Sequence, residues 1–228
     1  MKKLYERPVI TKHYSGFMNK FGSAPVSQYK SDIEGLQVKD LAEKYGSPLF
    51  VISEKRIREN QKKASRVFTT RYPKVQFAWS YKTNYLQAVC NIFHKEGSWA
   101  EVVSEFEYDK AVQTGIAGKD IIFNGPSKSK DALIKAIKNK SKIHIDHFDE
   151  LYLIIEIVNE LNINADVAIR VNMDTGIYPK WDRFGFNYEN GEALEALRRI
   201  IRVKNLNLVG LHTHIGTYIM NADAYKIA

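Results

Sequence analysis

Cysteine is almost missing from this sequence of 228 residues, which contains Cys90 and no other. A disulfide within the chain is therefore excluded, which fits a reducing compartment. Cys90 lies among apolar residues of an expected helix, and this favours a place in the core over a role as a nucleophile. A secretory signal and any run of about 18 apolar residues are also missing, so we expect no membrane span and a cytoplasmic protein.

Acidic residues are the minority among the charges, with 26 Asp and Glu against 34 Lys and Arg and a formal net charge of +8. The basic residues are dispersed, and the densest cluster is the set of lysines from Lys128 to Lys142. Such a cluster is typical of a solvated helix face, although it can also bind an anionic ligand or a nucleic acid. No aromatic residue interrupts it to stack on bases, so we expect no nucleic-acid partner.

Short apolar stretches alternate with amphipathic ones along most of the chain. The apolar stretches predict strands at 49–52, 75–81, 99–103, 121–124, 142–146, 166–172 and 206–214. The amphipathic stretches predict helices at 36–45, 53–69, 84–95, 105–115, 129–139, 148–161 and 189–203. From residue 75 onward, the repeated order of strand and helix predicts a parallel sheet that is covered by helices.

This pattern belongs to the α/β class, and its six strand–helix units favour a (β/α)8 barrel of the TIM type. A complete barrel of this kind takes about 250 residues. The sequence therefore predicts a barrel that is truncated after about six strands and occupies residues 36–228. Residues 1–35 have little periodicity and predict an extension or docking segment.

Candidate functional residues stand where the predicted strands end. They are Lys82, Glu101, Ser104, Glu107, Asn124, Gly125, Asp146, Arg170, Asn172, His212, His214, Gly216 and Thr217. Because the functional groups of a parallel barrel collect at the carboxyl ends of its strands, these residues predict one candidate site. A lysine and a histidine at two such ends are what a pyridoxal phosphate site needs.

Several of these residues allow an ordinary structural interpretation. Lys82 adjoins an apolar strand, so we expect a desolvated, nucleophilic amine, although a snorkelling lysine is the alternative. His212 and His214 point to the same side of a strand, so they can be core histidines or a metal-binding pair. Gly216 and Thr217 can bind a phosphate or form a plain turn.

Taken together, these motifs resemble the fold-type III pyridoxal phosphate enzymes, in particular the diaminopimelate and ornithine decarboxylase family. The resemblance covers residues 36–228 and rests on six segments in the family's order: Tyr81–Asn84, Ala100–Ser104 with Glu107, Ile121–Pro126, Ala168–Asn172, Arg183–Gly185 and Gly210–Thr217. Glu101 stands where Asp is more usual in the family, and Thr217 stands where Ser is usual. As a set, the segments favour the decarboxylase branch over alanine racemase.

The resemblance implies a role for each matching residue. Lys82 would form a Schiff base with pyridoxal phosphate, and His214 would stack on its ring. Thr217, with Gly216 and Ser104, would lie at the cofactor, Arg170 near its phenolic oxygen, and Glu101 would orient Lys82. The implied reaction is the loss of the α-carboxylate from an amino acid, with the cofactor as electron sink.

The resemblance also implies parts of the family that would lie after Ala228: a glycine-rich phosphate loop, a glutamate for the pyridinium nitrogen and a carboxy-terminal β domain. It implies a homodimer, no metal and a small amino acid substrate. The stretches at 14–22 and 173–181 are not typical of lysine-biosynthesis enzymes, which leaves that substrate open. Two alternatives remain: an amino acid racemase on the same barrel, and a non-catalytic homologue that binds the cofactor or a protein partner.

Overall fold

The computed structural model describes residues 18–19, 22–23 and 30–228, and the chain divides into two compact units, residues 1–52 and 53–228. The first unit contains two antiparallel hairpins, which pair Met18–Asn19 (β1) with Gly22–Ser23 (β2) and Asp32–Ile33 (β3) with Leu36–Gln37 (β4). Helix α1, Val38–Tyr45, follows directly, as the sequence predicts. Most of the stretch 14–22 lies outside the described residues, and the predicted domain boundary at residue 36 stays a prediction.

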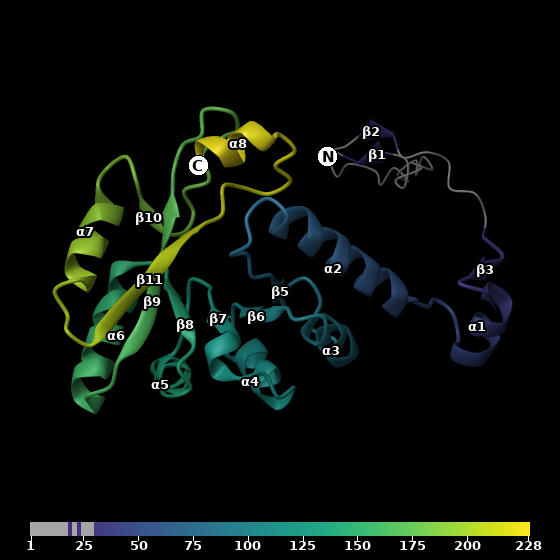
Figure 1. Ribbon diagram of the computed structural model, residues 1–228, viewed down its shortest axis with the longest axis horizontal. Helices are drawn as coiled ribbons and strands as arrows, with labels where there is room; N and C mark the ends of the chain where they lie inside the picture. The colour runs from purple at the N-terminus through teal and green to yellow at the C-terminus, as the bar shows by residue number, and fades with distance from the viewer. Residues whose placement is uncertain (1–17, 20–21, 24–29) are drawn as a thin grey trace, which may run out of the picture. The chain divides into compact units, whose positions relative to one another are not determined.

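The second unit is built on a parallel sheet, which confirms the predicted α/β class (Figure 1). The strands run in the order β5, β6, β7, β8 and β9, and β9 then pairs with both β10 and β11. Their bounds are Ala78–Ser80 (β5), Trp99–Val102 (β6), Ile121–Phe123 (β7), Lys142–Ile145 (β8), Ala165–Asn172 (β9), Phe186–Asn187 (β10) and Leu206–Thr213 (β11). Six of these strands follow the predicted ones, and the two-residue strand β10 was not predicted.

The strand predicted at residues 49–52 is wrong. These residues have no regular structure and are largely exposed. An apolar run becomes a strand only where another strand offers backbone partners, and no described strand pairs with this one.

Helices follow the strands as the sequence predicts, with slightly shorter bounds. They are Glu54–Thr69 (α2), Gln87–Lys95 (α3), Glu105–Gln113 (α4), Lys130–Lys138 (α5), Phe148–Leu161 (α6), Glu192–Ile200 (α7) and Ala222–Ile227 (α8), with a 3₁₀ turn at Gly118–Asp120. Ser53 and Ser129 cap their helices as expected, because each hydroxyl accepts a hydrogen bond from a backbone N–H of the first turn. The helices thereby begin at fixed points, directly after the loops that leave the sheet.

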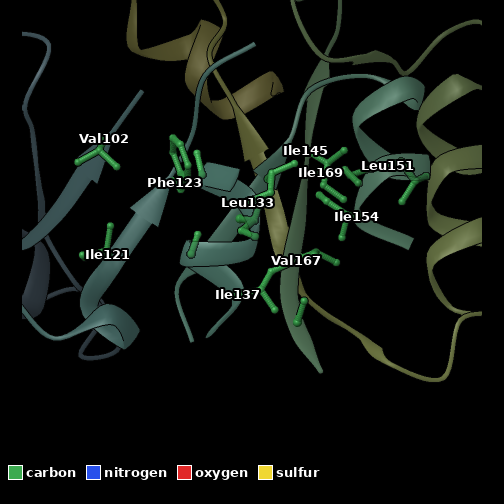
Figure 2. Close-up of a cluster of buried hydrophobic side chains, with 14 of the residues drawn as sticks. Val102, Ile121, Phe123, Leu133, Ile137, Ile145, Leu151, Ile154, Val167 and Ile169 are labelled. Carbon is green, nitrogen blue, oxygen red and sulfur yellow. The ribbon is translucent and has the colours of Figure 1, made fainter. Parts of the chain in front are cut away.

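The core lies between the sheet and helices α5 and α6. Ile145 of β8 and Val167 and Ile169 of β9 are fully buried there, as Figure 2 shows together with Leu151 and Ile154 of α6. Because successive side chains of a strand point to opposite faces, the neighbours of these residues point to the other side of the sheet. Cys90 is also buried, in agreement with the predicted core position.

Strand β11 was predicted to be buried, and this is wrong. Leu208 and Val209 are partly exposed, and Leu211 is 67% exposed. The strand pairs with β9 along one edge, and no described strand pairs with its other edge. Its apolar residues therefore meet fewer neighbours than the pattern of the sequence suggests.

The lysine cluster between Lys128 and Lys142 does not form one continuous solvated face. Lys130 and Lys135 lie at the surface and pair with acidic residues, and the Lys142 ammonium lies 4.1 Å from the ring centre of Trp99. The side chain of Lys128, in contrast, is fully buried, which the sequence did not predict. Among the described residues, no helix is long and apolar enough to cross a membrane.

Candidate functional site

A cavity of about 320 Å³ opens at the carboxyl ends of the strands. Four of the seven residues that the sequence assigns to cofactor binding or catalysis line it: Lys82, Glu101, Arg170 and His214. The strand-end candidates Asn124 and His212 line it as well. Its volume is at the lower end of the range that is usual for small-molecule pockets, about 300–1,000 Å³. The structure therefore brings together residues that are up to about 130 positions apart in the sequence.

Four further lining residues were missed by the sequence analysis: Ser80, Thr83, Ile122 and His144. Three of them stand two positions before a strand-end candidate, as Ser80 does before Lys82 and His144 does before Asp146. Residues i and i+2 of a strand share a face, so the spacing was the signal that would have found them.

The end of β5 is fixed directly before Lys82. Tyr81 is fully buried, and its hydroxyl lies 2.8 Å from Nε2 of His94 on α3. Nδ1 of His94 donates to the carbonyl oxygen of Ser98 at 2.8 Å, so Nε2 is the acceptor for Tyr81. Burial raises the pKa of Tyr81 and lowers the pKa of His94, so both groups remain neutral. Lys82 itself is exposed, which corrects the expectation that the apolar strand desolvates it.

Glu101 and Asn124 form the wall that β6 and β7 contribute. The side-chain amide of Asn124 donates to Oε1 of Glu101 at 3.0 Å. The loop after β7 lies very close to the loop after β6. A Cβ atom on Gly125 would therefore come within 2.4 Å of the carbonyl oxygen of Val103. Gly125 also has a φ of +101°, which favours glycine. A side chain at this position would therefore displace Asn124 from Glu101.

Arg170 of β9 is the most enclosed cation that lines the cavity, with 8% of the residue exposed. A guanidinium nitrogen lies 3.5 Å from the carboxylate of Asp146, and the guanidinium lies 5.1 Å from the ring centre of Phe184. Burial lowers the pKa of Arg170 and the charge of Asp146 opposes this, while arginine stays charged in proteins.

The turn Arg183–Gly185 is held against Arg170. The side-chain amide of Asn172 donates to the carbonyl oxygens of Phe184 and Gly185, at 3.0 and 2.8 Å. Gly185 has a φ of +86°, and a Cβ atom there would come within 2.7 Å of the carbonyl oxygen of Arg170. Asn172 thus acts on the site through this turn and does not line the cavity.

Three imidazoles from two strand ends line the cavity. The rings of His144 and His212 lie 5.0 Å apart, and the ring of Trp181 meets His214 edge-on at 5.9 Å. Burial, together with the charge of Lys128 and Arg170, lowers the pKa of His144 to about 4. Burial and the neighbouring imidazoles and cations lower that of His212 to about 3. Burial also lowers the pKa of His214, so all three rings are neutral at pH 7.

The remaining strand-end candidates lie elsewhere. Ser104 caps α4 by accepting from the N–H of Glu107, and the Glu107 carboxylate accepts from the N–H of Val103 at 2.8 Å. Burial raises the pKa of Glu107. Gly216 and Thr217 follow β11 but do not line the cavity. The structure thus gives Ser104 and Glu107 a role in the turn between β6 and α4, and the cofactor contacts of Ser104, Gly216 and Thr217 stay predictions.

The chemistry of the cavity is that of a site for a polar ligand. Among the described residues, four buried atoms that belong to lining residues have no hydrogen-bond partner: Ser80 Oγ, Asn124 Oδ1, His144 Nδ1 and His212 Nδ1. Buried polar atoms are nearly always paired, so such a cluster indicates a partner that binds in the cavity. In the described part of the chain, no group of three or more His, Cys, Asp or Glu side chains could hold a metal ion.

A second cavity is larger and differs in character. It measures about 870 Å³, lies among β11, α7 and α8, and is lined largely by apolar residues. His212 is the one candidate residue that lines both cavities. Lys82, Glu101, Arg170 and His214 line the smaller cavity and not the larger one.

Comparison with known proteins identifies the family. Residues 54–228 match the model of the pyridoxal-dependent decarboxylase family, pyridoxal binding domain. Diaminopimelate decarboxylase of Methanocaldococcus jannaschii is 33% identical over 208 residues, which are 85% of this chain and 47% of that protein. Diaminopimelate decarboxylase of Bacillus subtilis is 29% identical over 206 residues, which are 86% of this chain and 47% of that protein.

Solved structures agree with the sequence matches. The structure of diaminopimelate decarboxylase from M. jannaschii in complex with L-lysine has a TM-score of 0.77 and 31% identity, and the match covers 85% of this chain and 48% of that one. A Helicobacter pylori enzyme, also complexed with L-lysine, has a TM-score of 0.70 at 25% identity over 82% of this chain and 48% of that one. The chain spans about half the length of the curated relatives it matches. It belongs to the pyridoxal-dependent decarboxylase family, residues 54–228 match the pyridoxal-binding domain of that family, and pyridoxal phosphate is the cofactor.

Proposed function

We propose that this chain carries the cofactor site of an amino acid decarboxylase, a pyridoxal phosphate-dependent carboxy-lyase similar to diaminopimelate decarboxylase. One observation carries the proposal: the amine of Lys82 shares a single cavity with Glu101, Arg170 and His214. The family match and the relatives support the reaction type. The activity, substrate and partners of the whole protein remain part of this proposal, since the relatives are about twice as long.

The residues of the cavity fit pyridoxal phosphate. Lys82 is exposed at the mouth, where its amine can react with an aldehyde. The neutral imidazole of His214 offers a flat face, and its edge contact with Trp181 holds the plane of the ring. The guanidinium of Arg170, fixed by Asp146, can bind an anionic oxygen, and the unpaired atoms of Ser80, Asn124, His144 and His212 can bind polar atoms of the ligand.

When bound, pyridoxal phosphate supplies an electron sink for the pair that remains when the bond to a carboxylate breaks. The chain itself provides the setting for that chemistry. Lys82 would bind the cofactor, Glu101 would contribute a side chain that Asn124 orients, and Arg170 would supply a positive charge. His144 and His212 are neutral, so the part of the cavity wall that they form can bind polar atoms of the ligand without adding a charge to the site.

The proposed substrate is an amino acid with a second polar group on its side chain. Two of the similar structures contain L-lysine, which is an amino acid of this kind. We also propose a homodimer, as the family resemblance implies. The cytoplasmic location stays a prediction.

Cofactor binding tests the site. The chain is mixed with pyridoxal phosphate, reduced with borohydride and digested, and the modified peptide is identified by mass. We expect one pyridoxyl group on Lys82, none in Lys82→Ala, and an unchanged amount in Lys95→Ala, which replaces an exposed lysine of α3. Modification spread over surface lysines, or equal in all three proteins, would refute the site.

Product analysis tests the reaction. Release of carbon dioxide from amino acids that include diaminopimelate, lysine and ornithine supports the decarboxylase, and Lys82→Ala should abolish it. Inverted stereochemistry without carbon dioxide would favour the racemase. A cofactor adduct without any turnover, also in a longer chain of the same protein, would favour the non-catalytic homologue.

A further inference from the structure

The lysine of the basic cluster with a fully buried side chain, Lys128, does not line the cavity described above, although its charge helps to lower the pKa of His144 there. Lys128 Nζ donates to the carbonyl oxygen of Gly125 at 2.7 Å, to that of His144 at 2.9 Å and to Oε1 of Glu150 at 2.6 Å. An ammonium group has three hydrogen atoms to donate, so its capacity is used completely. The side chain of Lys128 is 0% exposed and that of Glu150 is 3% exposed.

The two residues fasten three segments to one another. Gly125 belongs to the loop after β7, His144 to β8, and Glu150 to the first turn of α6. The second carboxylate oxygen of Glu150 accepts from the backbone N–H of Asp146 at 2.9 Å. His144 of β8 and Asp146, directly after the strand, therefore cannot shift without breaking a bond to this pair.

One of these two residues lines the cavity, and the other pairs with a residue that lines it. His144 lines it directly, and Asp146 holds the guanidinium of Arg170 at 3.5 Å. Lys128 and Glu150 are thus connected to the cavity through backbone atoms of the residues that form it. A buried ion pair adds little net stability compared with well-packed apolar residues, so stability alone does not account for one at this place.

We propose that Lys128 and Glu150 are positioning residues, which set the places of His144 and of the Asp146–Arg170 pair for cofactor binding. This inference rests on the proposed cofactor site. It assigns the two residues no contact with the cofactor or substrate.

Three variants of the 228-residue chain separate positioning from stability. Lys128→Met leaves the carboxylate of Glu150 buried without its partner and should lower both the resistance to urea and the affinity for pyridoxal phosphate. The double variant Lys128→Met/Glu150→Leu removes both charges and should regain most of the resistance to urea. The matched control is Lys130→Met, two positions away, which breaks the surface pairs with Glu156 and Glu160.

Titration of the visible absorption band with pyridoxal phosphate gives the affinity. We expect it to stay about tenfold or more below that of the unaltered chain in the double variant, since loss of supporting residues around a site typically costs about 10–100-fold. The control should stay within about twofold. An affinity in the double variant equal to that of the unaltered chain would overturn the proposal.

A second measurement does not need the cofactor. The imidazole NMR resonances of His144 and His212 should move in the double variant, while those of His94, which is bound to Tyr81 and Ser98, should not. If the unaltered chain binds no pyridoxal phosphate at Lys82, the proposed function fails. The NMR resonances alone then test whether Lys128 and Glu150 position His144. Unchanged resonances of His144 and His212 would refute it.

Discussion

Strands β9 and β11 are neighbours of equal length with opposite surroundings. Each has eight residues, and they are hydrogen-bonded in parallel from Leu206 beside Ala165 to Thr213 beside Val171. Side chains of β9 are almost all buried, whereas those of β11 are mostly exposed. Both strands are rich in apolar residues, so the difference arises from what packs on them. Burial is therefore a property of the neighbours as much as of the strand.

Two parts of the candidate site differ in their surroundings in the same way as the two strands. Arg170 on β9 is enclosed by Asp146, Phe184 and the turn at Gly185. His214, directly after β11, has the edge of Trp181 as its ring contact. One part of the site is thus enclosed by several contacts, and the other part follows a strand whose second edge pairs with no described strand. Substitutions at matched positions of the two strands should reveal this difference.

The largest difference is expected for a pair of register partners. Ile169 of β9 is fully buried, and Leu211 beside it on β11 is 67% exposed. Ile169→Ala leaves a cavity and should lower the free energy of unfolding by about 3 kcal/mol. Leu211→Ala should lower it by less than about 1 kcal/mol. Urea denaturation measures both, and equal losses would show that β11 is packed as tightly as β9.

A pair of glycines extends the comparison to the backbone. Gly185→Ala forces a side chain at a φ of +86° towards the carbonyl oxygen of Arg170, and we expect a loss of about 2 kcal/mol. Gly210→Ala on β11 meets nothing within 4 Å, and we expect a change of less than about 0.5 kcal/mol. Thermal unfolding of the two variants checks this. A tolerated Gly185→Ala would mean that the turn can move away from Arg170.

Local pattern was enough to predict most elements of the second unit. The apolar stripe of residues 148–161 predicted α6 with the bounds that the structure has, because the spacing of apolar residues is a local property of one helix. Strand β10 was missed, because a strand of two residues is too short to show the alternation of apolar and polar residues that predicts a strand. The exposure of β11 and the burial of Lys128 were missed for another reason: each depends on residues that the fold brings in from elsewhere.

In the candidate site, too, the residues that a local pattern marks were predicted and those that depend on distant residues were missed. Lys82, Glu101, Arg170 and His214 were found because each stands at or near the end of a predicted strand, and strand ends of a parallel sheet meet at one edge. His144 was missed although it stands two positions before Asp146, because its ring contact with His212, 5.0 Å away, joins two strands that are distant in the sequence. The pairing of Asp146 with Arg170 likewise joins two strands that no local pattern connects.

Acid should test the enclosed part of the site selectively. Burial lowers the pKa of His144 to about 4, while an unfolded histidine titrates near about 6.5. The unfolded chain therefore binds the proton first, and the contribution of neutral His144 to stability is complete above about pH 6.5 and is lost as the pH falls towards 4. We expect a loss of about 1–2 kcal/mol over this interval, and a smaller one in His144→Asn. Urea denaturation at a series of pH values measures it, and an unchanged slope in the variant would contradict the assignment.

The smallest effect on stability is expected at the edge of β11 that pairs with no described strand, where the effect on association should be the largest. An exposed strand edge offers unpaired backbone groups to another chain, and a charged side chain discourages such pairing. Val209 is 47% exposed, so Val209→Lys should change the free energy of unfolding by less than about 0.5 kcal/mol. Light scattering at increasing protein concentration should show less self-association than in the unaltered chain. Ile201→Lys introduces the same charge at a residue that is 69% exposed and lies outside the strand, so association should stay unchanged there. If both variants reduced association equally, the cause would be general charge repulsion and not the strand edge. Strands β9 and β11 would then differ only in how tightly their side chains are packed.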